Sequence, residues 1–197
     1  KSTIKAADLD HRRKINFNIG KYNAIVPAGK KQFANIMQTR EWAKNRKWEA
    51  IENLDKYLED FEKKITERGA KVLWASDAKE AQEYIGDICI ARNCKTLVKS
   101  KSMVTEEIHL NNYLESKGIE SVETDLGEYI QQLDGESPYH IVTPAMHKSK
   151  EDVAKLFAEK LGTPAGLTPE ELTLVARKKL REKYVQAEVG VTGANFI

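Results

Sequence analysis

The stretch LVKSKSMVTEEIHLNNYLESKG, residues 97–118, joins an apolar segment to a helical one through the sequence Lys-Ser-Lys-Ser. It predicts a buried strand, a short polar hinge and a helix that ends at Gly118, because glycine is common just beyond the last turn of a helix. Two lysines and two serines at such a hinge leave two interpretations open. One is an anion-binding site, and the other is ordinary turn and capping chemistry.

The alternation of strand and helix continues on both sides of this stretch. Further strands are predicted at 70–76, 119–125, 139–144 and 187–193, with helices between them. Capping signals mark three helix starts: Asp77 with Glu80, Ser149 with Asp152, and Thr168-Pro169 with Glu171. Strands that alternate with helices indicate crossover connections. We therefore expect an α/β domain with a mostly parallel sheet covered by helices on both faces.

The N-terminal part of the chain has a different pattern. Residues 1–30 are polar, include a basic cluster at 11–14, and predict an extended arm that lies on the surface or on a partner. Residues 31–197 would form the domain. From about residue 31 the pattern is helical, and an apolar stripe ends at Gly69; its members are Trp48, Ile51, Leu54, Leu58, Phe61 and Ile65.

Composition excludes several classes of protein. A formal net charge of +2, with 41% apolar and 31% charged residues, argues against a dedicated nucleic-acid binder and fits a globular protein. No apolar run is long enough to span a bilayer. Only two cysteines are present, which is typical of a reducing compartment, so we expect the cytoplasm. The chain begins without methionine and ends on GVTGANFI, and from this we expect a fragment of a longer protein.

The hinge is the first candidate site, because ligands of open parallel sheets gather outside the carboxyl ends of the strands. A helix start offers free N–H groups to an anion, Ser100, Ser102 and Thr105 add hydroxyls, and Lys99 and Lys101 add positive charge. The alternative is that Ser102 or Thr105 is the helix cap and both lysines are solvated. The acidic residues at 106–107 favour this alternative, because they already complement the helix dipole.

Secondary candidates follow the other strands. The acidic residues after the third strand would act as a base or hold substrate hydroxyls, although helix capping by Asp125 is an alternative. His140 lies inside the fourth strand and is expected to be a buried histidine, whereas His147 lies in the loop beyond it. The secondary pocket residues are therefore Asp125, Gly127, Glu128, His147, Thr192, Gly193 and Asn195.

The sequence gives little support for a resident metal. His140 and His147 lie seven residues apart with no third ligand in view. Cys89 and Cys94 have C-x₄-C spacing, but an iron–sulfur cluster is normally held by four thiolates. We expect neither a metal nor a cofactor in this chain.

Two long motifs carry a family resemblance. VKSKSMVTEEIHLNNYLESKGIESVETDLGEYIQQL and HIVTPAMHKSKEDVAKLF resemble the N-terminal part of the lactate-utilisation (LUD domain) iron–sulfur proteins, which include the iron–sulfur subunits of bacterial L-lactate oxidation complexes. The resemblance runs from the helix near Trp48 through EVGVTGANF, and residues 1–30 match least.

The resemblance implies more than the residue pattern does. It implies a fold similar to glucosamine-6-phosphate deaminase, ribose-5-phosphate isomerase and CoA transferases. It also implies [4Fe–4S] clusters in a full-length parent that works with partner subunits in the cytoplasm, oxidises L-lactate to pyruvate and passes electrons onward. The hinge would then bind a small carboxylate or phosphate, and we expect no activity from the isolated chain.

Two rival functions stay open. One is a docking and assembly module that binds the other subunits without touching substrate. The other is an enzyme acting on a sugar phosphate or CoA ester, by analogy of fold alone. An unpaired strand edge at the C-terminal segment would also favour a homo-oligomer.

Overall fold

The structure, a computed structural model, describes residues 2–139 and 143–193. The chain forms two compact units. One contains the residues up to Ile15 together with those from Ala75 onward, and the other is Asn16–Trp74. The sheet and the predicted site residues belong to the first unit.

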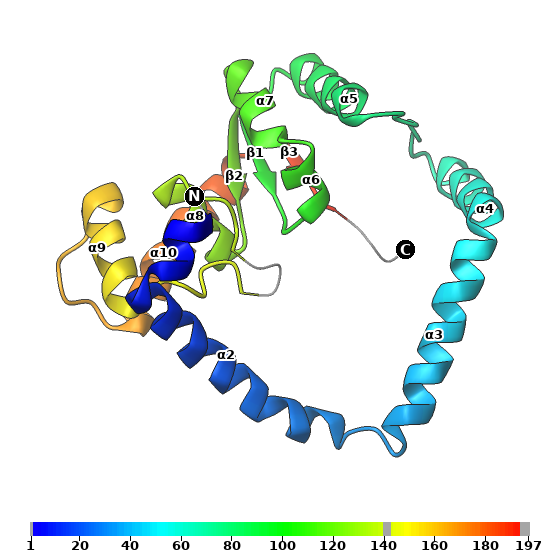
Figure 1. The fold of residues 1–197 in the computed structure, drawn as a ribbon. Coiled ribbons are helices and arrows are strands. Elements are labelled where there is room, and N and C mark those ends of the chain that lie inside the picture. The colour runs from blue at the N-terminus through cyan, green and yellow to red at the C-terminus, as the bar shows by residue number, and fades with distance from the viewer. Residues whose placement is uncertain (1, 140–142, 194–197) are drawn as a thin grey trace. The chain divides into compact units, whose positions relative to one another are not determined.

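The sheet has three parallel strands in the described residues: β1 (Thr96–Lys99), β2 (Glu120–Glu123) and β3 (Val189–Val191). Figure 1 shows β1 in the centre, between β2 and β3. The register places Lys99 opposite Glu123 on one side and opposite Val191 on the other. The carboxyl ends of all three strands therefore lie in one row. This confirms an α/β architecture with a parallel sheet and three of the five predicted strands.

The helices of this unit are α1 (Ser2–Ala7), the start of α2 (Leu9–Lys30), α5 (Ala78–Ala91), α6 (Met103–Glu107), α7 (Leu110–Ser116), α8 (Leu126–Asp134), α9 (Lys150–Leu161) and α10 (Pro169–Gln186). The predicted caps are confirmed. Asp77 accepts from Glu80 N, and both capping boxes, at Ser149 and at Thr168, are complete.

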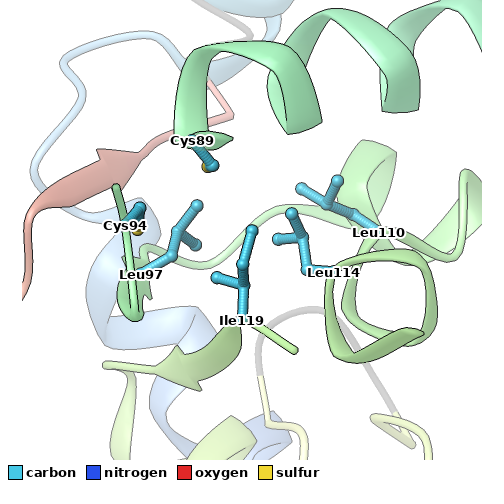
Figure 2. Packing of buried hydrophobic residues seen from close by; sticks show 6 residues of the cluster. All are labelled: Cys89, Cys94, Leu97, Leu110, Leu114 and Ile119. Atoms are coloured by element: carbon cyan, nitrogen blue, oxygen red, sulfur yellow. The ribbon is translucent and has the colours of Figure 1, made fainter. Parts of the chain in front are cut away.

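Two hydrophobic clusters stabilise this unit. Figure 2 shows the first, in which side chains of α5 and α7 meet Leu97 of β1; it consists of Cys89, Cys94, Leu97, Leu110, Leu114 and Ile119. The second joins α8, α9 and α10 and consists of Tyr129, Ile130, Leu156, Phe157, Leu172 and Ala176. Because side chains alternate along a strand, Val98 is buried on the sheet face opposite Leu97.

Two of the predicted strands are not among the strands of the sheet in the described residues. The segment 70–76 was expected to be a strand, but it has no regular structure, and Leu73 and Trp74 are exposed. An apolar segment becomes a strand only when a neighbouring strand takes its backbone hydrogen bonds, and no described strand pairs with this one. Within the predicted strand 139–144, residues 140–142 lie outside the described residues.

Residues 2–7 and 9–30 are helical, so the extended conformation expected of this segment is wrong. Within α2, Asp10 forms ion pairs with Arg13 and Lys14 at helical spacing, which favours a helix. Lys14 also binds Asp152 of α9 at 2.6 Å, and this contact fixes the start of α2 on the unit that contains the sheet.

Two expected helices are each divided into two. The apolar stripe lies on α3 (Ile36–Glu52) and α4 (Leu54–Glu67), which are separated at Asn53, and Gly69 has the positive φ of +88° expected of a glycine after a helix end. The helix predicted after the hinge breaks at His109, which adopts a left-handed conformation with φ 50°. The β-branched residues just before it are weak helix formers.

Candidate functional site

The segments that follow the three strands meet at the carboxyl edge of the sheet. Ser100 N donates to Val191 O at 2.9 Å, and Ser100 Oγ donates to Thr192 Oγ1 at 2.8 Å. On the other side of β1, both the backbone N–H and the hydroxyl of Thr124 donate to Lys99 O, each at 2.9 Å. Residues that follow separate strands therefore lie next to one another at this edge.

Close packing at this edge requires glycine at one position. A Cβ added at Gly193 would lie 2.0 Å from Ser102 Oγ and 2.4 Å from Ser102 Cβ. The absence of a side chain therefore allows the segment after β3 to approach the start of α6. Gly127 is less demanding, because its Cβ would lie 3.0 Å from Pro144 Cδ.

Lys99, the last residue of β1, is completely buried, and its charge is compensated by ion pairs within the protein. Its Nζ lies 2.6 Å from Glu123 Oε1 and 2.9 Å from Glu106 Oε1, and it donates to Thr105 Oγ1 at 2.9 Å. Three acceptors match the three protons of an ammonium group. An anion from outside would therefore have to use Ser100 and Lys101, because in this arrangement Lys99 has no free donor.

A hydrogen-bonded network holds Glu123 in place. Asn111 Nδ2 donates to Glu123 Oε1 at 3.0 Å, and Ser121 Oγ donates to Asn111 Oδ1 at 2.9 Å. Gln132 of α8 accepts from Glu123 N at 3.0 Å and donates to Ser121 O at 2.6 Å. These contacts link β2 to α7 and α8 around the ion pair, so the position of the carboxylate is fixed by several elements.

Glu128 is a second buried acid at this edge. It is 2% exposed, neither carboxyl oxygen has a hydrogen-bond partner among the described residues, and Glu123 Oε2 is likewise unpartnered. Burial, followed by the negative charges of Glu123 and Asp125, raises the pKa of Glu128 to about 7. A carboxyl group with a pKa near neutrality can both accept and donate a proton at physiological pH. We refer to Lys99, Glu106, Glu123 and Glu128 as the carboxyl-edge cluster.

Of the remaining residues at this edge, some cap helices and one is available to bind an anion. Ser102 is the N-cap of α6 and accepts from Thr105 N at 3.3 Å, as the capping alternative predicted. Asp125 caps α8 by accepting from Gly127 N and Glu128 N. Lys101 is partly exposed, and its Nζ lies 3.7 Å from Asp125 Oδ1, beyond hydrogen-bonding distance. Lys101 can therefore still donate to a ligand.

His147 lies apart from this cluster, in a polar groove between the start of α2 and α9. Its Nε2 lies 2.9 Å from Glu136 Oε2, and its ring lies against those of His11 and Tyr139, with centroids 5.4 and 5.0 Å away. Burial lowers the pKa of His147, although Glu136 opposes that effect. We call His11, Glu136, Tyr139, His147 and Lys148 the histidine groove. Two other candidates, His140 and Asn195, lie outside the described residues.

Sequence reasoning missed several members of both groups. Glu106 was interpreted only as complementing a helix dipole, Glu123 as an ordinary strand residue, and Asn111 was not considered. One signal was available: in a parallel pairing of the strands, Lys99 and Glu123 end adjacent strands in register. No pattern in the sequence connects His11 with His147, because the contact depends on how α2 lies against the rest of the unit.

The two cysteines do not fit an iron–sulfur cluster. Figure 2 shows Cys89 and Cys94 among leucine and isoleucine side chains. Burial raises the pKa of the Cys89 thiol to about 11, which favours the protonated form over the thiolate that a metal needs. A cluster also needs about four such ligands. In the described parts of the chain no group of three or more His, Cys, Asp or Glu residues is arranged to hold a metal ion, and none of the helices there is long and apolar enough to cross a membrane.

Comparisons with known proteins agree on one family. The model of the LUD domain matches residues 58–197, which include the whole carboxyl-edge cluster. The chain is 47% identical over 166 residues to "Lactate utilization protein B" of Geobacillus sp. (strain WCH70), and 47% identical over 167 residues to the protein of that name from Bacillus licheniformis. Each alignment covers 84% of this chain but 35% of the relative, so the chain spans about a third of the length of these relatives. No solved structure is significantly similar to the chain.

Proposed function

The chain belongs to the LUD domain family, and on that premise we propose that it is the LUD domain of an iron–sulfur protein that takes part in L-lactate utilisation. The observation that carries this proposal is the 47% identity to proteins named for lactate utilisation over 84% of the chain. The aligned region is long enough to include most of the unit that contains the sheet. Iron–sulfur chemistry and electron transfer are proposed for the full-length protein and its partner subunits, because Cys89 and Cys94 do not fit a cluster.

Within this domain we propose that the carboxyl edge of the sheet binds the carboxylate of a small hydroxy acid. Lys101 is the cation at this edge whose ammonium is partly exposed and has no partner within hydrogen-bonding distance among the described residues. Ser100 and Thr192 add hydroxyl oxygens beside it. Lys99 then acts indirectly, by holding Glu106 and Glu123 and thereby keeping the ends of β1 and β2 together.

Glu128 would supply the acid–base group of this edge. A pKa of about 7 lets it exchange a proton with a hydroxyl or carboxylate without a large energetic penalty in either direction. Its side chain is 2% exposed, so a ligand would reach it only through a local rearrangement of this edge. His147 lies in a separate groove and does not enter this proposal.

The test compares two lysines at opposite ends of β1. In the full-length protein assembled with its partner subunits, Lys101→Ala should weaken L-lactate-dependent dye reduction roughly tenfold or more, since a charge-assisted hydrogen bond contributes about 1.5–3 kcal/mol. Lys95→Ala removes the same charge just before the amino end of the strand and should change the rate less than about twofold. Equal rates in both variants would refute substrate binding at this edge.

Subunit docking is the second candidate function, and the apolar surface of residues 16–74 favours it. Large side chains on α3 and α4 are exposed, among them Met37, Trp42, Trp48, Ile51 and Leu54. Large apolar side chains gather at the surface where another protein binds. A Trp42→Ser/Trp48→Ser variant that no longer co-purifies with its partner subunits, while Lys101→Ala leaves lactate oxidation intact, would favour docking over substrate binding.

A further inference from the structure

A second candidate ligand site lies between α10 and the carboxyl end of β2. The groove there has a volume of about 590 Å³, which is typical of pockets that hold cofactor-sized molecules. Thr124 and Leu126 line one side, and one face of α10 lines the other. The groove does not include Ser100 or Lys101, so it is distinct from the edge proposed for the hydroxy acid.

The wall formed by α10 is held in a defined position. Leu172 and Ala176 are buried in the cluster that joins α8, α9 and α10. Near the other end of α10, Lys183 Nζ binds Glu120, the first residue of β2, at 2.6 and 2.8 Å. Contacts near both ends therefore hold the helix in place. Arg177 and Arg181 lie one turn apart on the face that lines the groove.

The positive charge of this groove is not compensated within the described residues. The lining contains Arg177 and Arg181 and no carboxylate, and neither guanidinium has a hydrogen bond or ion pair in the described part of the chain. The histidine groove differs, because Lys148 there lies against both Asp134 and Glu136. The hydroxyls of Thr124 and Thr173 are already donated, to Lys99 O at 2.9 Å and to Pro169 O at 2.8 Å, so the two arginines and the Tyr184 hydroxyl are the donors available to a ligand.

Apart from Thr124 and Thr173, the rest of the lining is apolar or aromatic. Leu126 and Leu180 present aliphatic surface, and Tyr184 presents an exposed ring. A single arginine satisfies both oxygens of a carboxylate, whereas two arginines one turn apart match a phosphate, which has three terminal oxygens. We propose that this groove binds a phosphate-bearing organic anion, whose phosphate contacts Arg177 and Arg181 and whose flat or apolar part rests on Leu126, Leu180 and Tyr184.

Binding of 1-naphthyl phosphate to the purified protein, followed by its fluorescence, tests this proposal. It combines a phosphate with a flat apolar ring, so it should bind more tightly than inorganic phosphate or 1-naphthol, each of which has only one of these parts. Arg177→Gln/Arg181→Gln should weaken its binding by roughly tenfold or more, because charge-assisted hydrogen bonds to both guanidinium groups are lost. Lys178→Gln removes the same charge from the same helix without touching the groove, and it should change the affinity less than about twofold.

Several outcomes would overturn the proposal. One is no binding of 1-naphthyl phosphate at millimolar concentration, and another is an equal loss in the Lys178→Gln variant, which would indicate attraction by overall charge. A third is wild-type self-association that the double variant abolishes, which would place an acidic segment of a second copy in the groove. The single variants Arg177→Gln and Arg181→Gln replace the double variant if circular dichroism shows that it does not fold. The lactate proposal does not depend on any of these results.

Discussion

The carboxyl-edge cluster and the histidine groove both combine basic residues with carboxylates, yet they differ in access to water. In the first, Lys99 is completely buried and lies within 2.9 Å of two carboxylates, with the unpartnered acid Glu128 close by. In the second, Lys148 binds two carboxylates, and so does Lys14, which lines the same open groove beside His11. Burial raises the pKa of Glu128 in the first region and lowers the pKa of His147 in the second. The free energy of unfolding should therefore change with pH in opposite directions in the two regions.

The largest expected effect is at Lys99. Replacing it with methionine leaves the carboxylate of Glu123 buried without its cation, and breaking a buried ion pair in this way lowers the free energy of unfolding by about 3–5 kcal/mol. Lys14→Met removes a lysine that is 21% exposed and should lower it by about 1 kcal/mol or less. Chemical denaturation of both variants measures the difference.

A double variant separates charge from packing at this site. Lys99→Met/Glu123→Gln removes the lysine together with its buried carboxylate and should recover part of the stability lost in Lys99→Met, because the carboxylate that remains, Glu106, is 27% exposed to water. A loss in Lys99→Met no larger than in Lys14→Met would show that water reaches the cluster and that the comparison between the two regions is wrong.

The next effect is at Glu128, and its sign follows from the raised pKa. Between the ordinary glutamate pKa of 4.5 and the folded-state value of about 7, the folded state binds more protons than the unfolded state. The free energy of unfolding therefore falls as the pH rises through this window, by about 3 kcal/mol in total, and is level above it. Glu128→Gln has no charge to bury, so it should be more stable than the wild type at pH 7.5 and equal to it near pH 4.

Denaturation midpoints of the wild type and Glu128→Gln across pH 4–8 check this result. The difference between the two profiles isolates Glu128 from Glu123, Asp125 and Lys101, which remain in both proteins. A difference that does not change with pH would mean that Glu128 is solvated in the folded state.

The contrast between local and non-local features explains how far the sequence could predict this structure. The three strands and the caps at Asp77, Ser149 and Thr168 depend on residues within a few positions of one another, and all were predicted. The prediction of a strand at 70–76 was wrong because a strand also needs a neighbouring strand to pair with, and local periodicity does not specify one. Glu123 was missed because an acid in a strand is normally expected to face water, and only the parallel register with Lys99 shows otherwise.

The candidate site was predictable to a similar degree. The rule that ligands gather at the carboxyl ends of parallel strands selected Ser100, Lys101, Asp125 and Thr192, which lie together in the structure, but also His147, which does not. The same rule could not distinguish the buried Lys99 from the partly exposed Lys101, since the two residues differ in which way the side chain points rather than in type. The contact of His11 with His147 depends on how a helix more than a hundred residues away lies, which no motif encodes.

A smaller effect is expected where the carboxyl edge is closely packed. Gly193→Ala would place a methyl group 2.0 Å from Ser102 Oγ, so either the segment after β3 or the start of α6 has to move. We expect a loss of roughly 1–2 kcal/mol in the free energy of unfolding, as for other overpacked sites. Gly190→Ala is the matched control in β3 itself, where a Cβ meets nothing within 4 Å. Equal stability of the two variants would show that this contact is loose.

The smallest expected effect is in the histidine groove, and it tests the sign of the comparison. Because burial lowers the pKa of His147 below its ordinary value of 6.5, the unfolded state binds more protons just below pH 6.5. The stabilisation is complete above pH 6.5 and is lost as the pH falls toward the folded-state pKa, the reverse of the trend at Glu128. Glu136, which lies against His147, offsets part of this loss, and Lys148 and His11 add to it.

His147→Phe keeps a ring against His11 and Tyr139 but cannot titrate, so its unfolding free energy should fall less than that of the wild type between pH 6.5 and 5. His109→Asn changes an exposed histidine with a positive φ to a residue that tolerates that conformation, and its profile should follow the wild type. A wild-type profile that matches His147→Phe throughout this range would mean that the groove leaves His147 as accessible to protons as it is in the unfolded chain.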